Sequence, residues 1–218
     1  MIIANVILIY TNWVLSYLGT NFGQISTNYA YEAGERISIT GQGNQILYNK
    51  YGQLIKKMGY IFQYYSNGFL KSIIYEETNE TMHHFMYKNN QLILHMKPNT
   101  NEILKYYYYM DNKIMATYSN DTGLFSKFYY DDNNHIFAMK NNETTYYITT
   151  DLNGTPTSVF NTKTITVRNI RRTAFGLILE DSNPDFDLLP IGYFGGIEIP
   201  ECGVVLLDNR PYDNHLGK

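Results

Sequence analysis

The feature that most constrains the fold of this chain is a short pattern that recurs five times. In each copy a tyrosine is followed six positions later by isoleucine or leucine, with a polar stretch between them. The copies begin at Tyr31, Tyr48, Tyr64, Tyr87 and Tyr130. The first three starts are 17 and 16 residues apart (48−31 and 64−48), about the length of two strands with their turns. The pattern therefore predicts a series of antiparallel hairpins.

The residues between the tyrosine and the aliphatic side chain are of the types that tight turns require. Gly52 and Gly68 accept a positive φ, and Asn90 can hydrogen-bond its own backbone. The tyrosine closes one strand and the aliphatic residue opens the next, so we expect the two to face each other across the hairpin. Such a pair contributes about 0.2 to 1 kcal/mol beyond an alanine pair. The tyrosine ring fills space, and we expect its hydroxyl to reach water or a neighbouring backbone.

Composition agrees with an all-β chain. The sequence has 22 Tyr and 11 Phe, with 17% charged and 44% hydrophobic residues, a mixture that favours pleated, half-buried surface. No long segment keeps apolar residues at helical spacing. The net charge is −3 with both signs interspersed, so no basic stripe indicates nucleic acid as a partner. The single cysteine, Cys202, cannot form an internal disulfide and does not identify a redox compartment.

The repeat pattern is absent from the two ends of the chain. After about residue 146, Gly154 follows asparagine between apolar residues, which is a hairpin signal, and Gly195 and Gly196 mark bends. The apolar stretch Ile2 to Leu18 has three interpretations: a buried strand, a weak secretion signal or membrane anchor, or a start that is not native to the domain. The expected divisions are an N-terminal segment over 1–28, repeats over 29–145 and a terminal block over 146–218.

The terminal block carries a family resemblance. The segments FYYDDNNHIFAMK, TTYYITTDLNGTPTSVF, TAFGLILEDSNPDF, IGYFGG and DNRPYDNHLG resemble, in order and spacing, the Rhs-associated core that ends the YD-repeat shell of teneurins. The likeness is greatest at Asp181 to Phe186 and at Ile191 to Gly196, and the whole resemblance runs from about Tyr29 to Gly217. It implies successive antiparallel hairpins that form part of a β shell, an incomplete barrel, with the associated core plugging one end.

The resemblance also implies a role. Teneurins are large single-pass cell-surface proteins of cell adhesion and neuronal partner recognition. A place on the extracellular side of the plasma membrane is therefore expected, in a non-enzymatic module. The implied protein partners are other teneurins, adhesion receptors such as latrophilins, and the rest of the same shell in a longer parent. Two alternatives remain: a toxin-encapsulating shell of the bacterial Rhs or WapA type, and a truncated fragment without independent activity.

Residues that could carry chemistry favour a structural interpretation. The neighbouring carboxylates Asp131 and Asp132, and also Asp185 and Asp187, are interpreted as turn residues. The five histidines, at 83, 84, 95, 135 and 215, lack zinc-ligand spacing and are expected at the surface or in turns. The sequence has no Asp-Pro pair of the kind at which bacterial relatives cleave themselves. We expect no catalytic residue, no metal site and no cofactor.

Four Asn-x-Thr acceptor sequons occur in the chain. Those at Asn79, Asn120 and Asn142 lie in expected turns, where a glycan would be accessible, and they agree with extracellular exposure. The fourth, at Asn153, is the least favoured because Pro156 follows its threonine and because the turn itself is expected to be packed. The first three are therefore candidate N-glycosylation sites.

Overall fold

The protein folds into β-strands in two compact units. This computed structural model describes the backbone of residues 7–11, 14–18, 28–32, 35–41, 44–97, 102–163, 165–214 and 217, and side chains from residue 46 onward within these ranges. Unit 1 comprises residues 1–64 and 72–82, and unit 2 comprises residues 65–71 and 83–218. Within the described residues, no helix is long and apolar enough to be a candidate membrane span.

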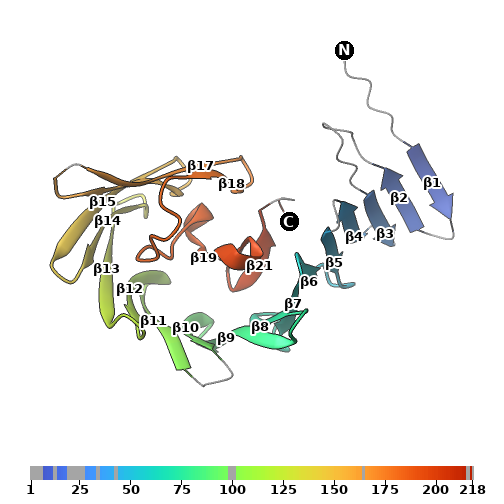
Figure 1. Cartoon of the computed structure of the whole chain (residues 1–218), viewed down its shortest axis with the longest axis horizontal. Helices are drawn as coiled ribbons and strands as arrows, with labels where there is room; N and C mark the ends of the chain where they lie inside the picture. The colour runs from blue at the N-terminus through green and yellow to red at the C-terminus, as the bar shows by residue number, and fades with distance from the viewer. Residues whose placement is uncertain are drawn as a thin grey trace, which may run out of the picture. The chain divides into compact units, whose positions relative to one another are not determined.

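Unit 1 is an antiparallel meander in which each strand pairs with the next along the chain (Figure 1). Its strands are β1 (Ile7–Thr11), β2 (Val14–Leu18), β3 (Asn28–Glu32), β4 (Glu35–Gly41), β5 (Asn44–Tyr48), β6 (Leu54–Lys57) and β7 (Tyr60–Tyr64). Strands β8 (Leu70–Tyr75) and β9 (Glu80–Lys88) run across the boundary between the units. Of the three interpretations of the apolar N-terminal stretch, the strand agrees with the β1–β2 hairpin, in which Ile7 pairs with Leu18.

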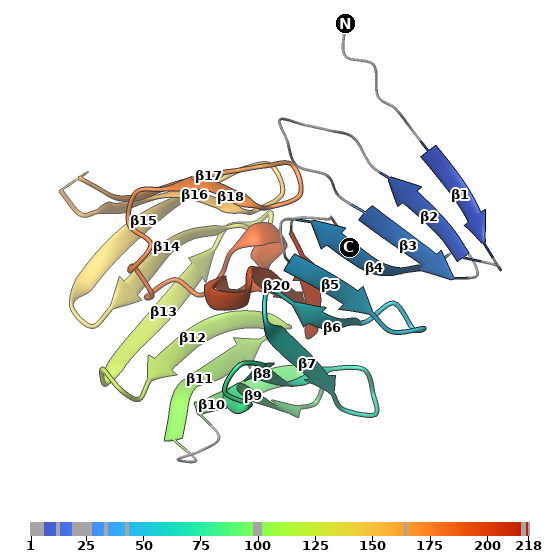
Figure 2. The same ribbon diagram turned by 45° about the vertical axis from the view of Figure 1, so that its right-hand side comes forward.

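Unit 2 contains a longer meander, which we call the wall: the antiparallel sheet from β9 to β18. After β9 its strands are β10 (Gln91–Lys97), β11 (Glu102–Met110), β12 (Lys113–Ser119), β13 (Leu124–Tyr130), β14 (Ile136–Asn141), β15 (Thr144–Thr150), β16 (Pro156–Asn161), β17 (Thr166–Arg172) and β18 (Ile178–Asp181). Figure 2 shows that the sheet curves strongly along this series.

Residues 183–214 follow the wall, and we call them the tail. The tail contains two short 3-10 helices, η1 (Tyr193–Gly195) and η2 (Pro200–Cys202), and a small antiparallel sheet of β19 (Ile197–Ile199), β20 (Val204–Leu207) and β21 (Arg210–Asp213). Figure 1 shows the tail on the inner side of the curve of the wall. Apolar side chains of both parts are buried in unit 2, among them Phe85, Leu92, Phe128, Met139, Val159, Ile191, Val204 and Val205. The predicted all-β fold built of successive hairpins is confirmed.

Five hairpin loops between named strands share one hydrogen-bond pattern, and the loop at 192–196 in the tail repeats it. In the loop at 131–135, the N–H of Asp131 donates to the carbonyl of His135 at 2.9 Å, and the N–H of Asn134 donates back to the carbonyl of Asp131 at 3.0 Å. Asn134 has a φ of 66°, so this is a three-residue loop whose last residue is left-handed. The loops at 49–53, 65–69, 151–155 and 173–177 repeat the pattern with Gly52, Gly68, Gly154 and Gly176 at the left-handed position.

Two of the expected cross-strand pairs form at such three-residue loops. Tyr48 pairs with Leu54, and Tyr130 pairs with Ile136, each six positions apart. The expectation is wrong for Tyr87, whose partner is Leu92, five positions on. The turn there is a two-residue one, because Asn89 and Asn90 both have positive φ and Lys88 pairs directly with Gln91.

Tyr31 likewise departs from the six-position rule. It pairs with Arg36, because Glu32 pairs with Glu35 and leaves two residues between these strands. A polar tetrad after a tyrosine therefore predicts the hairpin but not its register. The length of the loop sets the register.

Tyrosine hydroxyls join three hairpins of the wall to the hairpin before them. Tyr87 donates to the carbonyl of Leu70, and Tyr130 to that of Ile114, each at 2.8 Å. The hydroxyl of Tyr109 is hydrogen-bonded to the backbone of Leu92. Burial raises the pKa of all three phenols, so they stay protonated, and Tyr87 and Tyr130 remain hydrogen-bond donors.

The same contact occurs in unit 1, where the hydroxyl of Tyr64 donates to the carbonyl of Leu54. The acceptors Leu54 and Leu70 are the first residues of β6 and β8, and the acceptor Ile114 is the second residue of β12. The repeated tyrosine therefore satisfies a backbone carbonyl as well as filling space, as the sequence pattern predicts.

Candidate functional site

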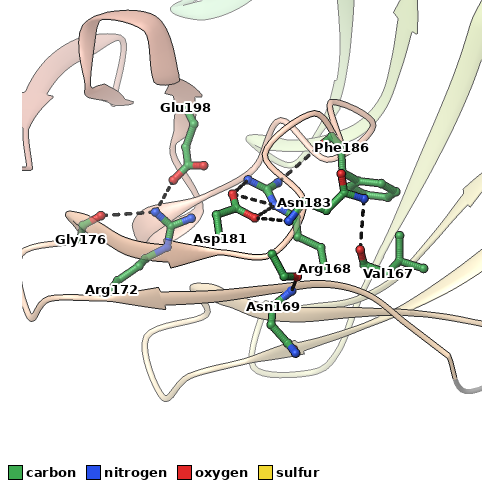
Figure 3. A network of polar contacts seen from close by, with 10 residues as sticks. Val167, Arg168, Asn169, Arg172, Gly176, Asp181, Asn183, Phe186 and Glu198 are labelled. Atoms are coloured by element: carbon green, nitrogen blue, oxygen red, sulfur yellow. Dashed lines mark hydrogen bonds and ion pairs between the residues drawn. The ribbon is translucent and has the colours of Figure 1, made fainter.

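The most specific set of polar contacts in the protein lies where the last hairpin of the wall meets the tail. Figure 3 shows this network, in which two arginines of β17 are directed toward the tail and its connection to β18. Arg168 contacts Asp181 at the end of β18, and Arg172 contacts Glu198 of β19. Both ion pairs are largely buried. We consider this region the candidate site because it fixes the path of the chain after the wall ends.

Arg168 and Asp181 form a two-pronged ion pair. The guanidinium donates from Nε to Oδ1 at 3.0 Å and from Nη2 to Oδ2 at 2.6 Å. Its Nη1 donates to the carbonyl of Phe186, at 3.3 Å, which ties the same side chain to the tail. Arg168 is only 5% exposed. A buried guanidinium is stable only when its donors are satisfied, so this arrangement strongly favours one position of residues 181–186.

The carboxylate of Asp181 also organises the turn that follows it. Its Oδ1 accepts the N–H of Asn183 at 3.0 Å, while the side chain of Asn183 donates to the carbonyl of Val167 at 3.2 Å. Burial alone would raise the pKa of Asp181, but the hydrogen bonds from Arg168 and Asn183 and the charges of Arg168 and Arg172 outweigh it and lower the pKa. Asp181 is therefore ionised near neutral pH.

A second buried ion pair lies four residues further along β17. Arg172 Nη1 lies 2.6 Å from Glu198 Oε1 and also donates to the carbonyl of Gly176 at 3.3 Å. Figure 3 shows Arg172 between these two partners. The carboxylate in turn lies against Gly192, where any side chain would overlap it. The pair thus joins the edge of the wall to the first strand of the tail sheet.

Tyr193 packs on the β17–β18 turn. Its hydroxyl donates to the carbonyl of Ala174 at 2.7 Å, and its ring lies directly over Gly176. A Cβ at position 176 would overlap that ring, and the φ of 86° there also favours glycine. On its other side Tyr193 stacks on Tyr212 of β21, with ring centroids 5.6 Å apart.

Three further hydrogen bonds hold the tail against the rest of unit 2. The N–H of Phe194 donates to Thr155 Oγ1 at 3.1 Å, and Thr155 is only 2% exposed. At the β20–β21 turn, the carbonyl of Asn209 accepts the N–H of Leu70 at 3.1 Å, and its side chain donates to the carbonyl of Asn90 at 2.7 Å. The turns contacted all lie along the edge of the sheet that carries the tyrosine-containing hairpin loops.

The histidines do not all lie where the sequence predicts. His83 and His95 are on neighbouring strands, and His83 Nδ1 lies 2.7 Å from His95 Nε2. His83 is 7% exposed, and its Nε2 has no hydrogen-bond partner among the described residues. Burial lowers the pKa of both, that of His95 to about 3. The expectation of surface or turn positions is wrong for this pair, because a sequence without strand register does not show which histidines share a face.

The other singled-out residues have structural positions. Asp131 accepts the N–H groups of Asn133 and His135 at 2.9 and 2.8 Å, which is the turn role expected of it. Asp185 and Asp187 are exposed, next to the turn that begins at Asn183. Within the described residues, no group of three or more His, Cys, Asp or Glu side chains could hold a metal ion.

The two glycines of the terminal block have different reasons to be glycine. Gly195 has a φ of 73°, whereas Gly196 is extended, with a φ of −73°. At Gly196 a Cβ would come within 2.8 Å of the carbonyl oxygen of Leu206 and closer still to the side chain of Val205. Gly196 is therefore required by close packing and Gly195 by its backbone conformation. His215 lies outside the described residues, as does the side chain of Tyr31.

Comparison with known protein families identifies the family of this chain. The model of one family, Teneurin YD-shell, matches residues 19–218. The chain belongs to the teneurin YD-shell family. The resemblance seen in the terminal block is thereby confirmed, and the wall and tail described above are parts of such a shell.

Individual teneurins match a shorter segment. Teneurin-m of Drosophila melanogaster is 38% identical over 73 residues, which is 34% of this chain and 3% of that protein. Teneurin-1 of Caenorhabditis elegans is 41% identical over 71 residues, 32% of this chain and again 3% of the relative. The matched segment is thus a small part of much longer proteins.

Among solved structures, the Photorhabdus luminescens Tc holotoxin pore is similar over 90% of this chain and 13% of its own, with 13% identity and a TM-score of 0.39.

Proposed function

We propose that this chain is a structural and recognition module of a teneurin-type protein at the cell surface, and that it acts through contacts with other proteins rather than by catalysis. The observation that carries the proposal is the match of the Teneurin YD-shell family to residues 19–218. The relatives that match individually are themselves teneurins. Self-association and binding to adhesion receptors of the latrophilin type are the partner classes proposed.

The geometry supports a role as a rigid module. The wall is held by hydrogen bonds repeated from hairpin to hairpin, and the tail is fixed to it by two buried ion pairs. A surface that recognises another protein benefits from such rigidity, because little conformational entropy is then lost on binding. Side chains that carry the fold are thus separated from those on the outside of the sheet, which remain available to partners.

The location can be tested on the natural protein. An antibody raised against this chain should label the surface of intact, unpermeabilised source cells, with enrichment where two cells touch. The same antibody on permeabilised cells gives the total signal for comparison. Labelling that appears only after permeabilisation would contradict the proposed location.

The recognition role needs a second experiment. The full open reading frame that contains this chain is expressed in suspension cells that do not aggregate by themselves. Cells that express it should form clusters with one another or with cells that display a latrophilin-type receptor. A frame carrying Gly176→Ala, which disturbs the wall–tail contact, serves as the control. Absence of clusters in both pairings, with surface expression verified, would overturn the proposed role.

A further inference from the structure

All four sequon asparagines are exposed, so the sequons differ in the surroundings of the asparagine and of its threonine. Asn79, Asn120 and Asn142 are exposed, and no described residue hydrogen-bonds their side-chain amides. The adjacent Asn141 shows the contrast, because its Nδ2 donates to Ser126 Oγ at 2.8 Å and the contact is buried. Of two neighbouring asparagines, the one that begins a sequon is therefore the accessible one.

The sequons at Asn120 and Asn142 lie on the same edge of the wall. Asn120 is in the β12–β13 turn and Asn142 in the β14–β15 turn, and alternate turns of a meander return to one edge. The N–H of Asn142 donates to the carbonyl of Phe125, at 3.3 Å, so the second turn lies beside the start of β13. The threonines that complete these sequons, Thr122 and Thr144, are exposed as well.

The fourth sequon lies on the opposite edge, where the tail docks. Its asparagine, Asn153, belongs to the β15–β16 turn, and its threonine, Thr155, is buried beneath the tail, with Oγ1 accepting the N–H of Phe194. Pro156 follows directly. The structure thus separates the sequons at Asn120 and Asn142, in which asparagine and threonine are both exposed, from that at Asn153, whose threonine is buried by the tail.

We infer that Asn120 and Asn142 are N-glycosylated and Asn153 is not, so that the β12–β13 and β14–β15 turns carry glycans and the β15–β16 turn carries none. Asn79, in unit 1, is exposed as well, but its threonine, Thr81, is half-buried. The inference rests on the proposed cell-surface function, since the modification requires passage through the secretory pathway. Bulky glycans on one edge would leave the opposite edge and the outer face of the sheet for protein contacts.

The reaction uses a lipid-linked oligosaccharide pyrophosphate as donor. A bond forms between Nδ2 of the asparagine and C1 of the first sugar, and the C1–O bond to the pyrophosphate breaks. The lipid pyrophosphate leaves, and the amide nitrogen loses one proton. No oxidation or reduction is involved.

The test expresses the full chain in animal cells behind an added secretion signal, with a C-terminal tag that contains one sequon of its own. Glycans are removed with peptide N-glycosidase from whole-cell lysate, so a chain retained inside the cell is still measured. The enzyme leaves Asp where a glycosylated Asn stood, and peptide mass spectrometry locates each site. Variants Asn120→Gln and Asn142→Gln are compared with Thr122→Ser and Thr144→Ser, which keep the sequons.

For the unchanged chain we expect two mass shifts besides that of the tag and any at Asn79. Each Gln variant should lose one of the two shifts, and the Ser variants should retain both. Asn153 should be unmodified. A glycosylated tag with Asn120 and Asn142 both bare would overturn the inference, whatever compartment the natural protein occupies. Occupancy of Asn153 equal to theirs would overturn the distinction between these sequons. Failure of the proposed function would give a different result: the natural protein would be absent from the cell surface in the antibody experiment.

Discussion

In the wall several hairpins repeat the contacts of the hairpin before them, whereas the contacts that fix the tail to the wall each occur once. Tyr87 and Tyr130 make the same hydroxyl-to-carbonyl bond on different hairpins, and several loops between strands reuse one geometry. The tail depends instead on single close fits, such as Tyr193 over Gly176, and on buried charges such as Arg168 with Asp181. Redundant contacts tolerate the loss of one member, and single contacts do not. The tail should therefore be the more sensitive region.

The largest effect is expected from Gly176→Ala in the tail contact. The new Cβ would overlap the Tyr193 ring at a position whose φ of 86° already disfavours alanine. We expect the free energy of unfolding to fall by about 3 to 5 kcal/mol, measured by denaturant titration of the full chain. Gly123→Ala in the wall is the control. It has a φ of 65° but nothing within 4 Å of the new atom, so about 1 to 2 kcal/mol is expected. Equal losses of unfolding free energy in the two variants would show that the overlap with the tail adds no cost to that of backbone strain.

Arg168→Met should follow, with a loss of about 3 kcal/mol, because it leaves the buried carboxylate of Asp181 without its partner. The same denaturant titration measures it. Arg171, on the same strand, forms an exposed ion pair with Glu180, and Arg171→Met should cause no measurable change. A loss in Arg171→Met as large as in Arg168→Met would mean that burial does not distinguish the two pairs.

The pair of His83 and His95 lies in the wall but is not part of its repeated pattern. It should make the free energy of unfolding depend on pH. The folded pKa values of His83 and His95 lie below the usual value, so the unfolded chain binds more protons. The contribution of the two histidines to the free energy of unfolding should be fully present above about pH 6.5 and should decrease as the pH falls toward 3. For His95 alone the loss at pH 5 is about 2 kcal/mol.

Thermal melts between pH 7.5 and 5 measure this effect. The variant His95→Gln, with one titrating group removed, should show a shallower decrease than the unchanged chain. Asp181 does not confuse the result, because its pKa is lowered and its own contribution is lost only at more acidic pH. A melting temperature that rises on acidification would contradict the assignment of a neutral pair.

The smallest effect is expected from Tyr130→Phe in the wall, which removes one hydroxyl of a repeated series. The carbonyl of Ile114 loses its donor, and a loss of about 1 kcal/mol should appear in the denaturant midpoint. The neighbouring Tyr129, which is 41% exposed, provides the control, and Tyr129→Phe should be neutral. If Tyr130→Phe is as damaging as Arg168→Met, the wall is not the redundant region.

Much of the wall could be predicted from the sequence because its determinants are local. A tyrosine, a polar tetrad with glycine or asparagine, and an aliphatic residue suffice to form a hairpin, as at Tyr48 and Tyr130. The family resemblance was visible for the same reason, since repeats place their residues at regular spacing. Loop length was harder: the two-residue turn at Asn89 and Asn90 shifted the pairing of Tyr87 by one residue.

The candidate site could not be predicted, because its contacts join distant parts of the chain. Nothing in the residues around Arg172 indicates that Glu198 is its partner, and Gly176 gives no sign that Tyr193 will cover it. Only the path of the tail across the wall brings them together. The feature that marks the site is the burial of the arginines of β17. The sequence does not show it, because burial is a property of the assembled fold.

Sequence alone determined that this protein is a chain of hairpins with tyrosines at their ends, since turn chemistry and side-chain alternation act over a few residues. Tertiary structure decided which histidines meet. Gln91 pairs with Lys88, but a shift in register between Leu92 and Leu94 makes His95 pair with Phe85 rather than His84. One extra residue in a strand reverses the face on which later side chains lie, and hydrogen bonding across the whole sheet, not local sequence, fixes where that residue is placed.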